Sequence, residues 1–291
     1  MILAVDIGGT KLATALIDDG EIVERRTAPS PLHGNFVTIP SLIARLSADW
    51  IGRYTAIGIA SAGLIEGQRV RLVSREGRPV LDLGAQIEAL LGYRPTIVND
   101  AWAGALGEYG RGEYRDAETL VYVTVSTGIG AGIVHKGQLL TSANGLMAHI
   151  GHMHGAQVTG TAQICHCGRT NCIEMIASGT GIERAASALH GSPISTREVF
   201  AREGTVPAFA ELLDRSAAAL AEVLVDARAL LGADCFVMGG SVGLVPAFFE
   251  RVRTDLATRH APWATELRPA ALGKDAELHG AALAALSHLN L

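Results

Sequence analysis

The stretch that decides the fold is "MILAVDIGGTKLATALIDDGEIVERR", residues 1–26. An apolar run is followed by a glycine turn, a second apolar run, an Asp-Asp-Gly turn and a third short run. Short apolar runs bounded by glycine and aspartate are typical of strands joined by tight turns. The sequence therefore predicts a β-meander whose first turn, "DIGGTK" at 6–11, is glycine-rich.

The same order of runs and turns returns in "LVYVTVSTGIGAGIVHKGQLL", residues 120–140. Val5 corresponds to Val123, and the later turn glycines Gly20 and Gly137 keep nearly the same offset. Self-similarity of this kind predicts a duplicated fold of two related domains.

Strands and helices alternate outside the two meanders, which predicts an α/β protein. The predicted strands are "AIGIASAGLI" (56–65), "PTIVND" (95–100) and "CFVMGG" (235–240), and the predicted helices are 101–110 ended by Gly110, 208–232 ended by Gly232, and 276–289. We place an N-terminal α/β domain at 1–115 plus 276–291 and a C-terminal α/β domain, with the cysteine-rich loop, at 116–275. The limit near 111–119 rests on local charge and glycine content and on the start of the second meander.

The composition describes a globular chain without a bias toward nucleic acid or lipid. Apolar residues make up 48% and charged residues 18%, which is too hydrophobic for a disordered chain. The formal charge of −5 is spread along the sequence, so we expect neither a nucleic acid nor a membrane partner. The chain has no apolar run of the roughly 20 residues that span a bilayer and no signal-peptide layout, so we expect a cytoplasmic protein.

Three of the four cysteines are concentrated in "CHCGRTNCIE", residues 165–174. Disulfides are rare in a reducing compartment, and thiolate sulfur and imidazole nitrogen are preferred ligands of Zn²⁺. Cys165, Cys167 and Cys172 would supply three of four ligands. Such a closed site has no position for water, so we expect a structural zinc ion that organises a loop.

The fourth ligand is left open between two nearby histidines. His152 or His154 closes the set, whereas His166 lies between two cysteine ligands and is expected to point outward.

Three glycine turns leave strands and are candidates for holding an anion. They are "DIGGTK" at 6–11, "STGIGAG" at 126–132 and "MGGSVG" at 238–243. Glycines allow backbone N–H groups to approach a phosphate closely, although a hairpin turn with two glycines needs no ligand. Neither a Walker motif nor a dinucleotide-binding spacing is present, so the turns favour a nucleotide gripped between two meander domains.

Asn99 and Asp100 stand where a predicted strand ends and a helix begins. Asp100 suits the N-cap of that helix, and a carboxylate at this place also lies where α/β proteins keep their ligands. The sequence leaves both roles open.

Together, these turns, the Asn-Asp pair, an H-x-x-H followed by "CHCGRTNCIE", and "GGS" resemble the ROK family of sugar kinases, a branch of the actin-like ATPases. The resemblance runs from residue 2 to the final helix, and C-x-C-G-x-x-x-C-x-E after a Gly-His pair is its most specific element. It implies two ribonuclease H-like domains with a nucleotide cleft between them, ATP with Mg²⁺, and phosphorylation of a hexose hydroxyl. The family commonly pairs, which implies a homodimer.

The resemblance also implies roles for individual residues. Asp100 would be the catalytic base for the sugar's 6-hydroxyl, Asn99 would hold neighbouring hydroxyls, and the zinc loop would position Glu174 against the sugar ring. The implied zinc set is His152, Cys165, Cys167 and Cys172. The implied substrate-binding residues are Gly63, Asn99, Asp100, His149, His152 and Glu174. The implied nucleotide-binding residues are Asp6, Gly8, Gly9, Thr10, Lys11, Thr127, Gly128, Gly130, Gly239 and Gly240.

One position at which this chain differs from most of the family indicates the acceptor sugar. His149 replaces the Glu of most relatives, and "HIGH" at 149–152 resembles members that act on N-acetylmannosamine. This implies formation of N-acetylmannosamine 6-phosphate in sialic acid breakdown, with N-acetylglucosamine or glucose kinase as alternatives. Another alternative is a sugar-responsive regulator, but only five residues precede Asp6, which leaves no room there for a DNA-binding domain. Sugar contacts from residues 74–83, where the family pattern is not kept, stay unassigned.

Overall fold

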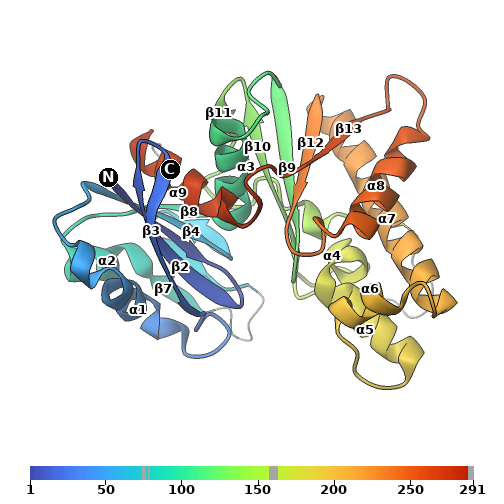
Figure 1. Cartoon of the computed structure of the whole chain (residues 1–291), viewed down its shortest axis with the longest axis horizontal. Coiled ribbons are helices and arrows are strands. Elements are labelled where there is room, and N and C mark those ends of the chain that lie inside the picture. Colours follow the sequence, from blue (N-terminus) through green and yellow to red (C-terminus); the bar gives the residue numbers. More distant parts are fainter. Residues whose placement is uncertain (74–76, 78, 157–162, 288–291) are drawn as a thin grey trace. The chain divides into compact units, whose positions relative to one another are not determined.

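The computed structural model describes residues 1–73, 77, 79–156 and 163–287 (Figure 1). Contacts group the chain into two compact units, Met1–Asp116 with Gly132–Met147 and Lys274–Leu291, and Ala117–Ala131 with Ala148–Gly273. The predicted domain limits at 115/116 and 275/276 remain a prediction, because a compact unit of the structure and a duplicated domain are defined differently.

The first meander forms as predicted. β1 (Ile2–Ile7), β2 (Lys11–Asp18) and β3 (Glu21–Pro29) pair antiparallel. Asp19 and Gly20 of the second turn have positive φ, at 46° and 81°, which matches the twist of a tight hairpin. β4 (Ala56–Ser61) and β8 (Thr96–Asn99) extend the sheet in parallel, in the order β3-β2-β1-β4-β8. The carboxyl ends of β1, β4 and β8 therefore lie at one edge of the sheet.

The two faces of this sheet bury different side chains, because successive residues of a strand point to opposite faces. Leu3 and Val5 join a core of large residues with α1 (Ile39–Leu46) and α2 (Leu83–Leu91). Ile2 and Ala4 join an alanine-rich core with α3 (Asp100–Arg111) and α9 (Ala276–Leu286).

Glycine allows α3 and α9 to pack unusually closely. A Cβ at Gly280 would lie 1.7 Å from the carbonyl oxygen of Ala103, and one at Gly107 would lie 2.2 Å from that of Ala276. Close backbone packing of this kind fixes the position of α3, whose first turn carries the Asn-Asp pair.

The second sheet repeats the order of the first. β9 (Thr119–Val125), β10 (Ile129–His135) and β11 (Gln138–Leu139) are followed by β12 (Cys235–Gly239) and β13 (Glu266–Pro269), in the order β11-β10-β9-β12-β13. β12 runs parallel to both β9 and β13. The shared strand order supports the predicted duplication.

Helices of the second unit follow the apolar patterns of the sequence. They are α4 (Glu174–Ala177), α5 (Gly179–His190), α6 (Thr196–Arg202), α7 (Pro207–Leu231) and α8 (Pro246–Ala257). The predicted end of α7 is confirmed, since Gly232 caps it with φ 63°. The smaller elements are β5 (Leu64–Glu66), β6 (Arg69–Arg71) and β7 (Val80–Asp82), which form one sheet, and the 3₁₀ turns Phe36–Thr38, Ala48–Trp50, Ile150–His152 and Gly273–Asp275.

The predicted end of α3 at Gly110 is wrong. The helix continues to Arg111, and the N–H of Gly112 caps it by donating to the carbonyl of Glu108. A Cβ at Gly110 would lie 2.5 Å from a methyl of Leu283 in α9, so this glycine makes room for a neighbouring helix.

Within the described residues, no helix is both long enough and apolar enough to span a bilayer. Residues 288 and 289 of the predicted terminal helix, and residues 74–76 and 78 of the stretch left unassigned for sugar, lie outside the described residues.

Candidate functional site

Two carboxylates meet at the sheet edge where β1 and β8 end. Asp6 is half-buried, and Asp100 is the first residue of α3. Burial, and then the negative charge of Asp100, raises the pKa of Asp6 from 3.8 to about 7, while Lys11 and Arg25 act in the opposite direction. The structure thus brings together the two acidic residues that the sequence singled out, 94 positions apart, in one electrostatically coupled pair.

The N-cap of α3 is Asn99, so the alternative role of Asp100 as N-cap is wrong. Asn99 has extended backbone angles, and its Oδ1 accepts hydrogen bonds from the N–H groups of Ala101 (3.0 Å) and Trp102 (3.4 Å). Asp100 already belongs to the helix, where its Oδ1 accepts from the N–H of Ala101 at 2.9 Å. The cap holds the Asp100 carboxylate at the strand end, and the Ala101 N–H orients it.

Gly63 lies beside Asn99. Its carbonyl oxygen accepts a hydrogen bond from Asn99 Nδ2 at 3.2 Å, and its φ of 109° favours glycine. Because both lone pairs of Oδ1 and one of the two Nδ2 hydrogens are already used, Asn99 can give at most one further hydrogen bond, as a donor.

The turn from Gly8 to Lys11 is closed by its own backbone. The N–H of Gly8 donates to the carbonyl of Lys11 at 3.0 Å, and the carbonyl of Thr10 accepts from Ser30 at 3.0 Å. A Cβ at Gly9 would lie 3.1 Å from Nε2 of His33, so glycine here gives space to a neighbouring imidazole. The sequence offered no signal for this approach of His33.

The other two glycine turns lie next to each other in the second unit. The N–H groups of Val242 and Gly243 both donate to the carbonyl of Val125, at 2.9 and 3.0 Å, and Ser126 Oγ lies 3.0 Å from Ser241 Oγ. Gly240 has φ 88°, and a Cβ there would lie 2.3 Å from the Val125 carbonyl oxygen. The exit of β12 is therefore folded tightly onto the end of β9.

The remaining residues predicted in these turns hold the turns in place through their backbone or through the lack of a side chain. The Thr127 carbonyl accepts from the N–H of Thr180 at 3.3 Å, and Gly130 is the second residue of β10. A Cβ at Gly239 would lie 2.4 Å from the hydroxyl of Tyr122.

Glu174 connects the cysteine loop to the first of these turns. Its Oε2 accepts a hydrogen bond from the N–H of Ile129 at 3.1 Å. A Cβ at Gly128 would lie 2.7 Å from the same oxygen, so only glycine leaves the carboxylate its place. This contact joins residues 45 positions apart, and the sequence did not predict it.

Four donor atoms from His152, Cys165, Cys167 and Cys172 lie within 4.8 Å of one another. His152 Nδ1 is 3.5 Å from Cys165 Sγ, and Cys167 Sγ is 3.5 Å from Cys172 Sγ. Ligands of a tetrahedral zinc ion are about 3.6 Å (N to S) and about 3.8 Å (S to S) apart, so both the donor types and the spacing fit Zn²⁺. His154, the other candidate, belongs to no such group among the described residues.

Three imidazoles gather at this cluster. The rings of His149 and His152 are stacked with centroids 6.0 Å apart, and that of His166 meets His152 edge-on at 5.1 Å. Burial lowers the pKa of His152, with the charge of Glu174 opposing. His166 is exposed, in agreement with the prediction that it points outward, and its Nδ1 lies 3.7 Å from Glu174 Oε1 and 3.8 Å from Cys165 Sγ.

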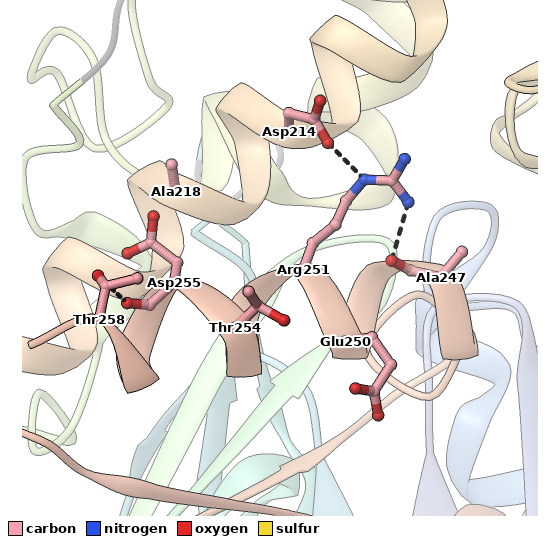
Figure 2. A pocket seen from close by; sticks show the side chains of 8 residues that line it. All are labelled: Asp214, Ala218, Ala247, Glu250, Arg251, Thr254, Asp255 and Thr258. Atoms are coloured by element: carbon pink, nitrogen blue, oxygen red, sulfur yellow. Dashed lines mark hydrogen bonds and ion pairs between the residues drawn. The ribbon is translucent and has the colours of Figure 1, made fainter.

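A separate pocket lies between α7 and α8 and contains none of the predicted site residues (Figure 2). The Arg251 side chain crosses it and donates to Asp214 Oδ1 at 2.6 Å and to the carbonyl of Ala247 at 2.9 Å. Because Arg251 is already paired, the pocket offers no unpaired cation for a phosphate.

Comparison with known proteins gives a consistent result. The sequence model of the ROK family matches residues 2–288. An N-acetylmannosamine kinase of Shigella boydii is 40% identical over 293 aligned residues, covering 97% of each chain.

Solved structures agree over the whole chain. The ROK hexokinase of Thermus thermophilus is 28% identical with a TM-score of 0.80, covering 99% of this chain and 98% of its own. A ROK family glucokinase of Streptomyces griseus, solved with glucose and AMPPNP, is 25% identical with a TM-score of 0.81, covering 98% and 99%. The predicted fold class, α/β with two actin-like ATPase domains, is confirmed.

Proposed function

The chain belongs to the ROK family, and from that premise we propose that it transfers the γ-phosphoryl group of ATP to the 6-hydroxyl of N-acetylmannosamine. Relatives named for this activity are 39–40% identical along almost their whole length. The observation that carries the proposal is the coupled pair Asp6 and Asp100 at the edge of the first sheet.

Asp100 is the catalytic base in this reaction. Its carboxylate accepts the proton of the 6-hydroxyl while that oxygen attacks the γ-phosphorus, and the bond from phosphorus to ADP breaks. The N-cap by Asn99 and the hydrogen bond from Ala101 hold the carboxylate in place before the sugar arrives.

The residues around Asp6 fit a divalent cation. The Asp6 and Asp100 carboxylates are electrostatically coupled there, and burial, followed by the negative charge of Asp100, raises the pKa of Asp6, so a positive charge at this place stabilises its ionised form. Mg²⁺, when bound with ATP, supplies that charge. Asp6 and the turn from Gly8 to Lys11 are proposed to hold the phosphates together with Thr127, Gly128, Gly130, Gly239 and Gly240.

Zn²⁺ is proposed to be held by His152, Cys165, Cys167 and Cys172, whose donor atoms fit a tetrahedral ion. The ion supplies rigidity, because Glu174 follows the last cysteine by two residues. We propose that Glu174 accepts hydrogen bonds from sugar hydroxyls through a carboxylate that is already oriented by Ile129.

The remaining proposed sugar contacts are Gly63, Asn99, His149 and His152. Asn99 contributes one N–H donor. An imidazole in its neutral form can both donate and accept a hydrogen bond, whereas the carboxylate that the family pattern carries at position 149 only accepts. This difference is the chemical basis for an acceptor preference. A homodimer is proposed from the family alone, and light scattering of the purified protein measures it.

A coupled ATP-dependent assay across N-acetylmannosamine, N-acetylglucosamine, glucose, mannose and fructose tests the acceptor. We expect the highest kcat/KM for N-acetylmannosamine, and a higher value for any other sugar rejects that acceptor. Asp100→Asn is expected to lower kcat roughly 10²- to 10⁴-fold while ATP still binds. The exposed Asp116→Asn is the matched control, and near-normal turnover of Asp100→Asn would refute the assigned base.

A further inference from the structure

A second group of donor atoms overlaps the cysteine cluster. It joins His166 and Glu174 to His152 and Cys165, and its four ligand atoms also lie within 4.8 Å of one another. His166 Nδ1 is 3.8 Å from Cys165 Sγ and 3.7 Å from Glu174 Oε1. Around tetrahedral zinc the corresponding distances are about 3.6 and about 3.4 Å, so shifts of a few tenths of an ångström bring the three atoms onto one ion.

Glu174 is oriented as a metal ligand should be. Oε2 is held by the N–H of Ile129, which leaves Oε1 turned toward His166. Carboxylates that ligate metals are commonly fixed by such a hydrogen bond, since it removes their rotational freedom before the ion arrives. The His166 side chain is 30% exposed, so an ion reaches it from solvent.

The charge at this place favours another cation. Three thiolates around one Zn²⁺ leave one net negative charge, and Glu174 adds a second. Arg169, which donates to the carbonyl of His152 at 2.9 Å, offsets part of it. A thiolate sulfur has several lone pairs, so Cys165 can bridge two ions.

We propose that His166, Glu174 and the bridging Cys165 form a second, weaker Zn²⁺ site beside the structural one, and that its occupancy inhibits the enzyme. The inhibition rests on the proposed function, since an ion on Glu174 withdraws the carboxylate from the sugar. The binding of a second ion does not rest on it.

The first test is metal content. Zinc-loaded protein is dialysed against increasing free zinc, and metal per chain is measured for the wild type, His166→Gln and the matched control His154→Gln. We expect the wild type and His154→Gln to rise from one to two zinc ions per chain, and His166→Gln to stay at one. A wild type that stays at one ion in excess zinc overturns the proposal, whatever the variants do.

The second test is activity at constant excess Mg·ATP with increasing zinc. His166→Gln is expected to keep the activity seen without added zinc and to need at least about 10- to 100-fold more zinc for half inhibition, since losing even a group that only hydrogen-bonds to a metal ligand costs that much affinity. Equal zinc sensitivity of His166→Gln and the wild type overturns the inhibitory role. If no variant phosphorylates any sugar, the proposed function fails, and the metal count still decides the second site.

Discussion

We expect Asp6 to make the folded protein less stable as pH rises, and we expect Asp6→Asn to remove this effect. The substitution keeps the size of the side chain and deletes the carboxylate whose pKa burial and Asp100 raise from 3.8 to about 7. Above its ordinary pKa, the unfolded chain ionises Asp6 freely while the folded protein resists ionisation. The free energy of unfolding therefore decreases between about pH 4 and pH 7, and the full cost persists at higher pH.

The size of the effect follows from the two pKa values. One pKa unit corresponds to about 1.4 kcal/mol, so the full cost above pH 7 is on the order of 4 kcal/mol. About half is already present at about pH 5.5, which leaves a change of about 2 kcal/mol between about pH 5.5 and pH 8.5. Asp6→Asn is expected to be more stable than the wild type at both pH values. The difference in the free energy of unfolding between the two proteins is expected to be about 2 kcal/mol larger at about pH 8.5 than at about pH 5.5.

Urea unfolding without Mg²⁺ and nucleotide, followed by tryptophan fluorescence, measures this difference. Trp50 and Trp102 are buried in the same unit as Asp6, so they report the relevant transition. Glu88→Gln, which neutralises an exposed carboxylate on α2, is the control for loss of one negative charge. A stability difference between Asp6→Asn and the wild type that does not grow with pH refutes the reasoning. In the proposed kinase, Asp6→Asn is also expected to lose activity, because the carboxylate that destabilises the fold is the one proposed to help bind Mg²⁺ and the phosphates of ATP.

Two predictions concern Glu174 and its loop. Gly128→Ala places a methyl 2.7 Å from Glu174 Oε2 and displaces the carboxylate from its bond to Ile129. Sugar binding must then re-orient the carboxylate at a cost of up to about 1.5–3 kcal/mol, the contribution of one hydrogen bond to a charged group, so the KM for sugar is expected to rise by up to roughly 10- to 100-fold. Initial rates against sugar concentration measure it, with the unobstructed Gly204→Ala as control, and an unchanged KM contradicts the assigned contact. Cys167→Ser is expected to lose zinc and sugar affinity together, while Cys235→Ser in β12 keeps one zinc ion per chain by metal analysis. The zinc site is ruled out if wild-type protein that was never exposed to a chelator contains less than a tenth of an equivalent of zinc.

Local sequence signals predicted both meanders, the strands β4, β8 and β12 and the helices α3, α7 and α9, but not every boundary. They did not identify α1, α2, α5, α6 or α8. Gly232 ends α7 because a residue in the left-handed region stops a helix, and the pattern before it is long and apolar. Gly110 has the same local context, yet the helix passes through it. Its role depends on Leu283, which approaches from another helix, and no local pattern contains that information.

Neighbouring residues with similar chemistry set another limit. Asn99 and Asp100 are both good N-caps, and the choice depends on which one keeps extended backbone angles at the end of β8. The strand pairing decides this, and it places Asp100 one step inside the helix, where its charge reaches Asp6. The sequence therefore identified the pair without assigning the cap.

Glu174 shows why the sequence could indicate the clustered donor atoms of the cysteine loop but not the contacts of that loop with the rest of the unit. Ligand chemistry selects cysteine and histidine from the sequence alone, since few other side chains bind Zn²⁺. The contacts of Glu174 join two turns that the sequence treats as separate motifs, because one oxygen lies on the Ile129 N–H and the other faces His166. Any movement of the metal loop consequently reaches the turn after β9, and a change at Gly128 reaches the loop. For this reason metal content, sugar affinity and the geometry of that turn are expected to change together, although no single motif in the sequence contains all three.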